Sequence, residues 1–76
     1  MNTNTECSIQ DKLIRMQLAD IRKSKHLTQE ELSKKSGLSK SCISNIESGD
    51  NSPTLRSLIR YVNALGVNIF VGDNNL

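Results

Sequence analysis

The sequence predicts an all-α domain of four helices followed by a short C-terminal strand. Three observations lead to this fold class. Apolar residues recur at helical spacing in the first and last thirds of the chain, a Ser or Thr cap precedes each of two short segments between them, and a β-branched run bounded by glycines comes last. The 76 residues suffice for one small domain, which excludes large enzyme scaffolds.

The first helix is predicted over residues 9–24, and residues 1–7 are expected to form a disordered tail because they show no periodicity. Ser8, with Asp11 three residues later, is a suitable cap for this helix. The apolar residues that follow at helical spacing are Leu13, Ile14, Leu18 and Ile21. The folded domain is expected to span residues 8–66.

The second helix is predicted over residues 29–36. Thr28 and Glu31 form a capping box, in which the Thr hydroxyl accepts from the third helical N–H and the Glu carboxylate accepts from the cap's own N–H. Gly37 is suited to the left-handed conformation that follows a helix end.

The third and fourth helices follow after short connections. Ser39 is the expected cap of a third helix over residues 40–47, only two residues past the preceding glycine. The fourth helix is expected to begin near Pro53 or Thr54 and to be closed by Gly66. Its apolar stripe comprises Leu55, Leu58, Ile59, Val62 and Leu65.

The last segment, residues 67–72, is predicted to be a strand because four of its first five residues are β-branched or aromatic. No second strand is found in the chain, and a lone strand leaves its backbone groups unpaired. We therefore expect it to pair with a second copy in a homodimer, and an irregular or helical tail packed on the fourth helix is the alternative. The expected dimer contacts are Val67, Ile69, Phe70 and Val71, and residues 73–76 form a tail.

The net charge of +2 is unevenly distributed. Residues 22–40 carry six basic and two acidic side chains, whereas the segments on either side each sum to −1. A basic block of this kind favours an anionic partner such as nucleic acid. On charge alone, a solvated helix face explains it equally well.

Several classes of function are excluded by the residues present. Cys7 and Cys42 are too few for a disulfide framework, and with His26 they match no closed zinc spacing. No glycine-rich phosphate loop or aromatic platform is found. We expect no enzyme activity, no metal and no cofactor. No apolar run approaches about 20 residues and the N-terminus has no signal sequence, so a cytoplasmic protein is expected.

The second and third helices, joined by a tight turn, form a helix-turn-helix. On the third helix, Cys42, Ile43 and Ile46 are expected to face the core. The opposite face comprises Lys40, Ser41, Ser44 and Asn45. Short donors and acceptors suit the edges of bases in a major groove. An ordinary solvent face is the alternative, although it would more often carry Glu, Lys and Gln.

Two segments carry a family resemblance: LTQEELSKKSGLS at residues 27–39 and ISNIESG at residues 43–49. They resemble the Cro/C1-type (Xre family) helix-turn-helix of phage repressors and bacterial regulators, and the likeness extends over residues 13–67. It implies a lambda-repressor-like DNA-binding domain. Ser33 stands where the family usually has Ala.

The resemblance implies roles by position. The residues that would meet bases are Ser39, Lys40, Ser41, Ser44 and Asn45, and those that would contact phosphate are Lys25, Gln29, Ser48 and Asn51. Lys40 is best placed to favour guanine, and Asn45 can read adenine with two hydrogen bonds. Arg22 and Glu47 match a pair that forms a salt bridge between the first and third helices.

The end of the chain, residues 65–73, is similar to that of HipB-type antitoxins, in which a strand after the fourth helix pairs across the dimer. The resemblance implies a homodimer that binds a palindromic double-stranded operator and represses its own operon. It also implies a HipA-like kinase toxin as a partner. An antitoxin whose main task is to neutralise such a kinase, with DNA binding secondary, is the alternative function.

Overall fold

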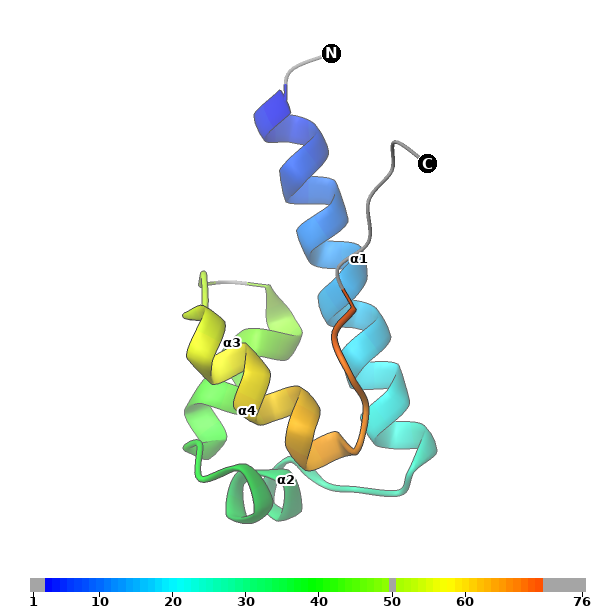
Figure 1. The fold of residues 1–76 in the computed structure, drawn as a ribbon, viewed down its shortest axis with the longest axis vertical. Coiled ribbons are helices and arrows are strands. Elements are labelled where there is room, and N and C mark those ends of the chain that lie inside the picture. The colour runs from blue at the N-terminus through cyan, green and yellow to red at the C-terminus, as the bar shows by residue number, and fades with distance from the viewer. Residues whose placement is uncertain (1–2, 50, 71–76) are drawn as a thin grey trace.

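The computed structural model describes residues 3–49 and 51–70 and shows four helices (Figure 1). Their bounds are α1 Thr3–Ser24, α2 Gln29–Ser36, α3 Lys40–Ser48 and α4 Leu55–Leu65. The predicted all-α fold with four helices is therefore confirmed. In the described part of the chain, no helix is long and apolar enough to cross a membrane.

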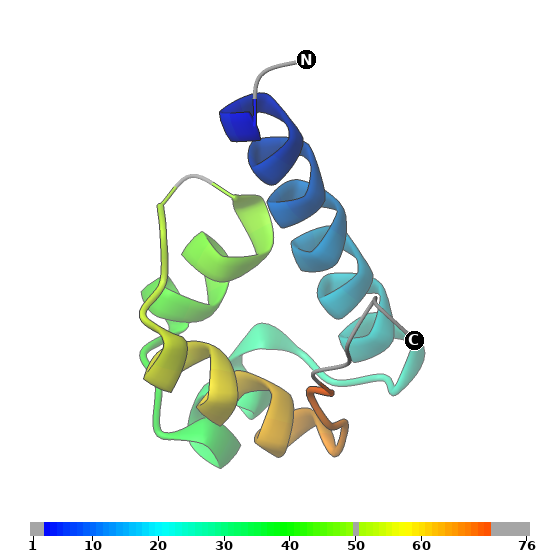
Figure 2. The same cartoon turned by 45° about the horizontal axis from the view of Figure 1, so that its top comes forward.

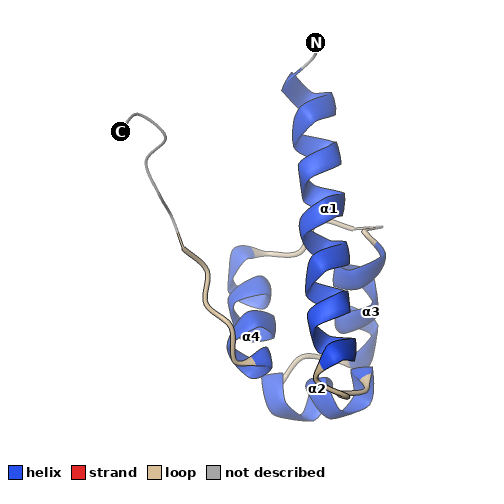
Figure 3. Cartoon of the chain, turned by 90° about the vertical axis from the view of Figure 1, so that its right-hand side faces the viewer, coloured by secondary structure: helices blue, strands red, loops and turns tan. Residues whose placement is uncertain are grey.

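The start of α1 differs from the prediction. The helix begins at Thr3, so the expected disordered tail over residues 1–7 is wrong for residues 3–7, and Ser8 lies inside the helix instead of capping it. No Gly or Pro interrupts the sequence before Ser24, and an established helix extends at little cost. Residues 1–2 lie outside the described residues. The first half of α1 projects beyond the other helices (Figure 3).

A Schellman motif closes α1. The N–H of His26 donates to the carbonyl of Lys23 at 3.0 Å, and the N–H of Leu27 donates to the carbonyl of Arg22 at 3.2 Å. This geometry requires a left-handed residue, and His26 has a φ of 58°. A histidine thus occupies a position that glycine would adopt more easily.

The capping box predicted for α2 is present. The N–H of Glu31 donates to Thr28 Oγ1 and the N–H of Thr28 donates to Glu31 Oε1, both at 3.0 Å. The hydrogen bond from the Thr28 backbone lowers the pKa of the Glu31 carboxyl. Gly37 closes α2 with a φ of 75°. Ser33 donates its hydroxyl to the carbonyl of Leu38 across the turn, a contact that alanine could not make.

The caps of α3 and α4 use the same chemistry. The N–H of Cys42 donates to Ser39 Oγ at 3.0 Å, and the N–H of Ser57 donates to Thr54 Oγ1 at 3.1 Å. Thr54 is therefore the cap of α4, which decides between the two predicted starts. After α4, a second Schellman motif places the N–H of Val67 on the carbonyl of Val62 at 3.1 Å.

The predicted C-terminal strand is not formed over residues 67–70, and residues 71–72 lie outside the described residues. A strand needs a neighbouring strand for its N–H and C=O groups, and the described chain supplies none. Val67 packs against the core, whereas Ile69 and Phe70 are exposed. The segment thus follows the alternative of an irregular tail.

One hydrophobic core joins all four helices. Its buried members are Leu18, Leu32, Ile43, Ile46, Tyr61, Val62 and Leu65. Burial of an aliphatic or aromatic side chain of this size contributes about 2 kcal/mol, so the core fixes α3 firmly between α1, α2 and α4. Tyr61 is fully buried, and its hydroxyl therefore needs a partner inside the fold.

We predict that His26→Gly raises the free energy of unfolding by about 0.5–1 kcal/mol, because glycine adopts the left-handed conformation without steric cost. Urea denaturation followed by circular dichroism measures the change. Lys25→Gly is the matched control, since its φ is not positive and the added chain freedom should destabilise the fold. Equal effects of both variants would contradict the prediction.

Candidate nucleic-acid interface

The two faces of α3 are divided as the sequence predicts. Ile43 and Ile46 are fully buried, and Cys42 is half-buried against the core. The polar face comprises the exposed side chains of Lys40, Ser41 and Ser44 and the half-buried side chain of Asn45. The buried face anchors the helix, so the polar face is presented on a rigid support.

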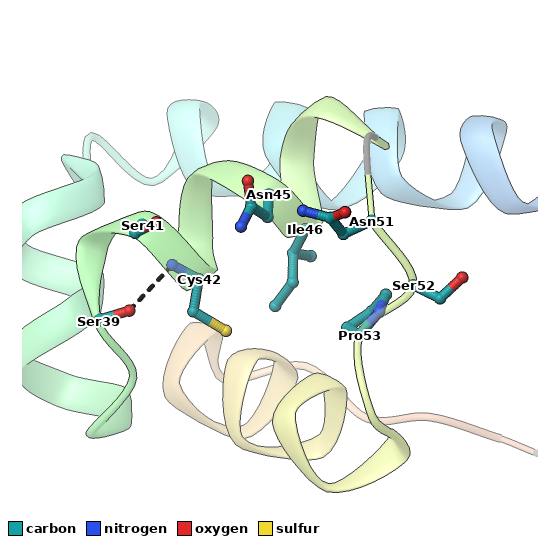
Figure 4. Close-up of a pocket in the computed structure, with 8 residues that line it drawn as sticks. All are labelled: Ser39, Ser41, Cys42, Asn45, Ile46, Asn51, Ser52 and Pro53. Atoms are coloured by element: carbon teal, nitrogen blue, oxygen red, sulfur yellow. Dashed lines mark hydrogen bonds between the residues drawn. The ribbon is translucent and has the colours of Figure 1, made fainter.

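A pocket lies where α3 faces the segment that leads into α4 (Figure 4). It is lined by Ser39, Ser41, Cys42, Asn45, Ile46, Asn51, Ser52 and Pro53. The fold therefore brings Asn51, a predicted phosphate contact, next to three predicted base contacts. Ser39 also caps the helix, but its hydroxyl keeps a proton that it can donate to a further acceptor.

None of the other three predicted phosphate contacts lines this pocket, and Ser48 is the last residue of α3, where its hydroxyl donates to the carbonyl of Asn45 at 3.3 Å. Lys25 lies in the turn after α1, and its ammonium is 3.7 Å from the position of a Cβ on Gly66, at the end of α4. A cation there also stabilises the C-terminal carbonyls of that helix. Gln29 begins α2, and its side-chain amide Nε2 donates to Glu47 Oε1 at 3.1 Å. Gln29 thus braces α3.

The carboxylate of Glu47 is held by three other side chains. The salt bridge expected with Arg22 is present, with Nε 2.7 Å from Oε2 and Nη2 2.9 Å from Oε1. Tyr61 donates its hydroxyl to Oε2 at 2.6 Å, and Gln29 binds Oε1. Arg22 also donates to the carbonyl of Leu27 at 2.6 Å. Glu47 therefore connects α3 to α1, α2 and α4.

The surroundings of this carboxylate shift three pKa values. Burial raises the pKa of Glu47, but the hydrogen bonds from its three partners outweigh burial and hold this pKa below its ordinary value. The hydrogen bond to Glu47 raises the pKa of Arg22. Burial, followed by the hydrogen bond to Glu47, raises the pKa of Tyr61, so its phenol remains a donor.

Sequence reasoning missed Arg15. This side chain is only 4% exposed, and its Nε and Nη2 donate to the two carboxylate oxygens of Asp11 at 2.8 and 3.1 Å. Its Nη1 donates to the backbone carbonyls of Asn45 and Asn51. The signal was its spacing, because Arg15, Leu18 and Arg22 lie at i, i+3 and i+7 on one face of α1.

Sequence reasoning also gave no role to Tyr61. It lies three residues from Leu58 and four from Leu65 on the apolar side of α4, where its hydroxyl required a buried acceptor.

Among the described residues, no group of three or more His, Cys, Asp or Glu side chains is arranged to hold a metal ion. Cys7 and Cys42 are free thiols.

We predict that Glu47→Gln lowers the free energy of unfolding by about 3 kcal/mol at neutral pH, because the buried guanidinium of Arg22 loses its counter-charge. Because the pKa of Glu47 is lowered in the folded protein, the stabilisation that its carboxylate provides is fully present above the ordinary carboxyl pKa of about 4.3. This stabilisation is lost as the pH falls through the pKa that Glu47 has in the folded state. Urea denaturation of both proteins, at about pH 7 and about pH 3, should show the difference shrinking in acid.

The control is Glu30→Gln, which removes an exposed acid from the first turn of α2 and should cost under about 1 kcal/mol. An equal cost for the two variants at neutral pH, or a difference that persists in acid, would contradict the role given to Glu47.

Comparison with known proteins places this architecture in a family. Residues 18–71 match the family model described as helix-turn-helix. The chain is also 41% identical over 56 residues to the uncharacterised HTH-type transcriptional regulator y4dJ of Sinorhizobium fredii, an alignment that covers 74% of this chain and 73% of that protein. These matches confirm the expectation of a DNA-binding protein rather than an enzyme. The chain belongs to the helix-turn-helix family.

Proposed function

We propose that this protein is a sequence-specific transcriptional regulator that binds a palindromic double-stranded operator as a homodimer in the cytoplasm and represses its own operon. The observation that carries the proposal is that α3 buries Ile43 and Ile46 fully and presents a polar face to a partner. Its relative y4dJ is described as a transcriptional regulator. A dimer over a promoter would repress by blocking polymerase.

The polar face of α3 has the chemistry to read base pairs. An α-helix fits the major groove, where each base pair shows a distinct pattern of donors and acceptors. Lys40 can donate to guanine O6 and N7, and Asn45 can bind adenine N6 and N7 together. The hydroxyls of Ser39, Ser41 and Ser44 are short enough to reach base edges as donors or acceptors.

Contacts to phosphate would fix the register of α3 in the groove. Gln29 begins α2, where backbone N–H groups favour an anion, and Ser48 and Asn51 flank the exit of α3. Lys25 adds a positive charge at the end of α1.

A homodimer is supported by the apolar surface around the end of α4. Leu55, Ile59, Ile69 and Phe70 are exposed, and Phe70 is 87% exposed. Together with Val62, three of them line a groove between α4 and the following segment. A two-fold contact would cover such a surface on both copies at once. Side chains of Val67, Ile69, Phe70 and Val71 would contribute to it. The two α3 helices would then reach half-sites about 10 base pairs apart, or a multiple of that distance.

A HipA-like kinase toxin is the second candidate partner. The outer face of α1 carries Ile9, Leu13 and Met16 at i, i+4 and i+7, each about half exposed. An apolar stripe on a projecting helix is suited to a protein contact. Salt separates the two functions, since DNA binding weakens with a log–log slope of about −0.9 for each phosphate neutralised, whereas a protein contact of this kind need not.

We predict that Asn45→Ala weakens binding to a preferred duplex by about 1–3 kcal/mol and relaxes base preference at one position, because alanine cannot bind adenine. Selection of bound duplexes from a randomised library identifies that preferred duplex. Fluorescence anisotropy then compares it with a scrambled duplex at two salt concentrations. Equal losses on both duplexes would refute base reading by Asn45, and a wild-type protein without any preference would refute the proposed function.

We predict that Ile69→Lys converts a dimer into a monomer, because the substitution places a charge in the apolar surface that the dimer would bury. Light scattering coupled to gel filtration measures the mass. Gln17→Lys, which adds the same charge at an exposed position outside this groove, is the control and should keep the dimer. A dimer mass for Ile69→Lys would overturn the proposed interface.

A further inference from the structure

The guanidinium of Arg15 connects two segments that are both proposed to touch DNA. Its Nη1 lies 3.3 Å from the carbonyl oxygen of Asn45 and also binds the carbonyl of Asn51. Asn45 is a proposed base reader and Asn51 a proposed phosphate contact. The side chain that joins them comes from α1 and is buried.

The contact with Asn45 compensates for a feature of α3. The last turn of α3 contains no basic residue, although the carbonyls at a helix C-terminus favour a cation. The carbonyl of Asn45 accepts from the N–H of Gly49 at 3.2 Å and from the Ser48 hydroxyl at 3.3 Å. Arg15 adds the positive charge that the last turn of α3 lacks.

The connection after α3 is packed against the same side chain. A Cβ on Gly49 would lie 3.5 Å from Lys12 Cγ and 4.0 Å from Arg15 Cδ, so the stems of both residues cover this turn. Figure 2 shows the end of α3 beside α1. Asp11 holds the other side of the guanidinium through two hydrogen bonds. The guanidinium of Arg15 is therefore held by Asp11 on one side and by the two backbone carbonyls on the other. In this position it restrains the loop that follows α3.

We propose that Arg15 is a positioning residue for specific DNA recognition, which sets the end of α3 at Asn45 and the loop at Asn51 in one relative register without touching DNA. The inference rests on the proposed function. Base reading requires both segments in register, whereas contacts to phosphate on any sequence tolerate small displacements. Loss of Arg15 should therefore reduce preference between sequences more than it reduces binding to DNA in general.

The test compares wild type, Arg15→Met and Arg60→Met on the duplex selected from the randomised library and on a scrambled duplex. Arg60 is exposed on α4 and serves as the control for the loss of one positive charge. We expect Arg15→Met to lower the affinity for the selected duplex by about 10- to 100-fold, as for one lost base contact. The affinity for the scrambled duplex should fall by under about twofold. The salt slope should match that of wild type, because a buried Arg15 neutralises no phosphate.

Three results would overturn the inference: an equal loss on both duplexes, a selectivity equal to that of wild type, or a salt slope reduced by about 0.9, which would show a direct phosphate contact. A wild-type protein without preference for the selected duplex would instead refute the proposed function, so the two failures are distinguishable.

A second variant covers the case in which Arg15→Met does not fold by circular dichroism. Asp11→Asn keeps Arg15 but weakens one of the contacts that orient it. Because Asp11 is exposed, this substitution leaves the core intact. We expect a smaller loss of selectivity in the same direction, with amide chemical-shift changes in two-dimensional NMR concentrated at residues 45–53. Unchanged selectivity together with unchanged shifts in that segment would overturn the inference.

Discussion

The carboxylate of Glu47 determines how the four helices are arranged. A charge removed from water must be fully compensated, and here Arg22 from α1, Gln29 from α2 and Tyr61 from α4 all donate to it. Because Glu47 is in the last turn of α3, these contacts fix that helix relative to every other helix. The angle between α2 and α3, on which a helix-turn-helix depends, is thus constrained by polar contacts as well as by the core.

The helix starts that the sequence predicted correctly depend on neighbours in the chain. The caps at Thr28, Ser39 and Thr54 each bind an N–H three residues later, so residue type and spacing suffice to find them. The start of α1 was missed because Ser8 is also a good cap, and a cap residue does not stop a helix that forms on both sides of it. The strand over residues 67–72 was predicted from β-branched residues alone, although a strand also requires a partner strand.

In the candidate interface, too, features that depend on near neighbours in the sequence were predicted, and contacts between distant residues were missed. Helical spacing was enough to separate the buried Ile43 and Ile46 from the polar face of α3. Arg15 was missed because its two carbonyl partners are 30 and 36 residues away, and no local pattern specifies such contacts. The Arg22–Glu47 pair spans 25 residues and was expected only through family resemblance.

The division of α3 into two faces has a consequence for evolution. Lys40, Ser41 and Ser44 are exposed, so exchanging them for other polar residues changes the free energy of unfolding by only about 0.5 kcal/mol or less. Ser39 is less replaceable, because its hydroxyl also caps the helix. In the proposed binding mode, the fold can therefore acquire a new operator by substitutions at three positions while its architecture is inherited unchanged, and descendants of one ancestral regulator can diverge in target without first gaining stability.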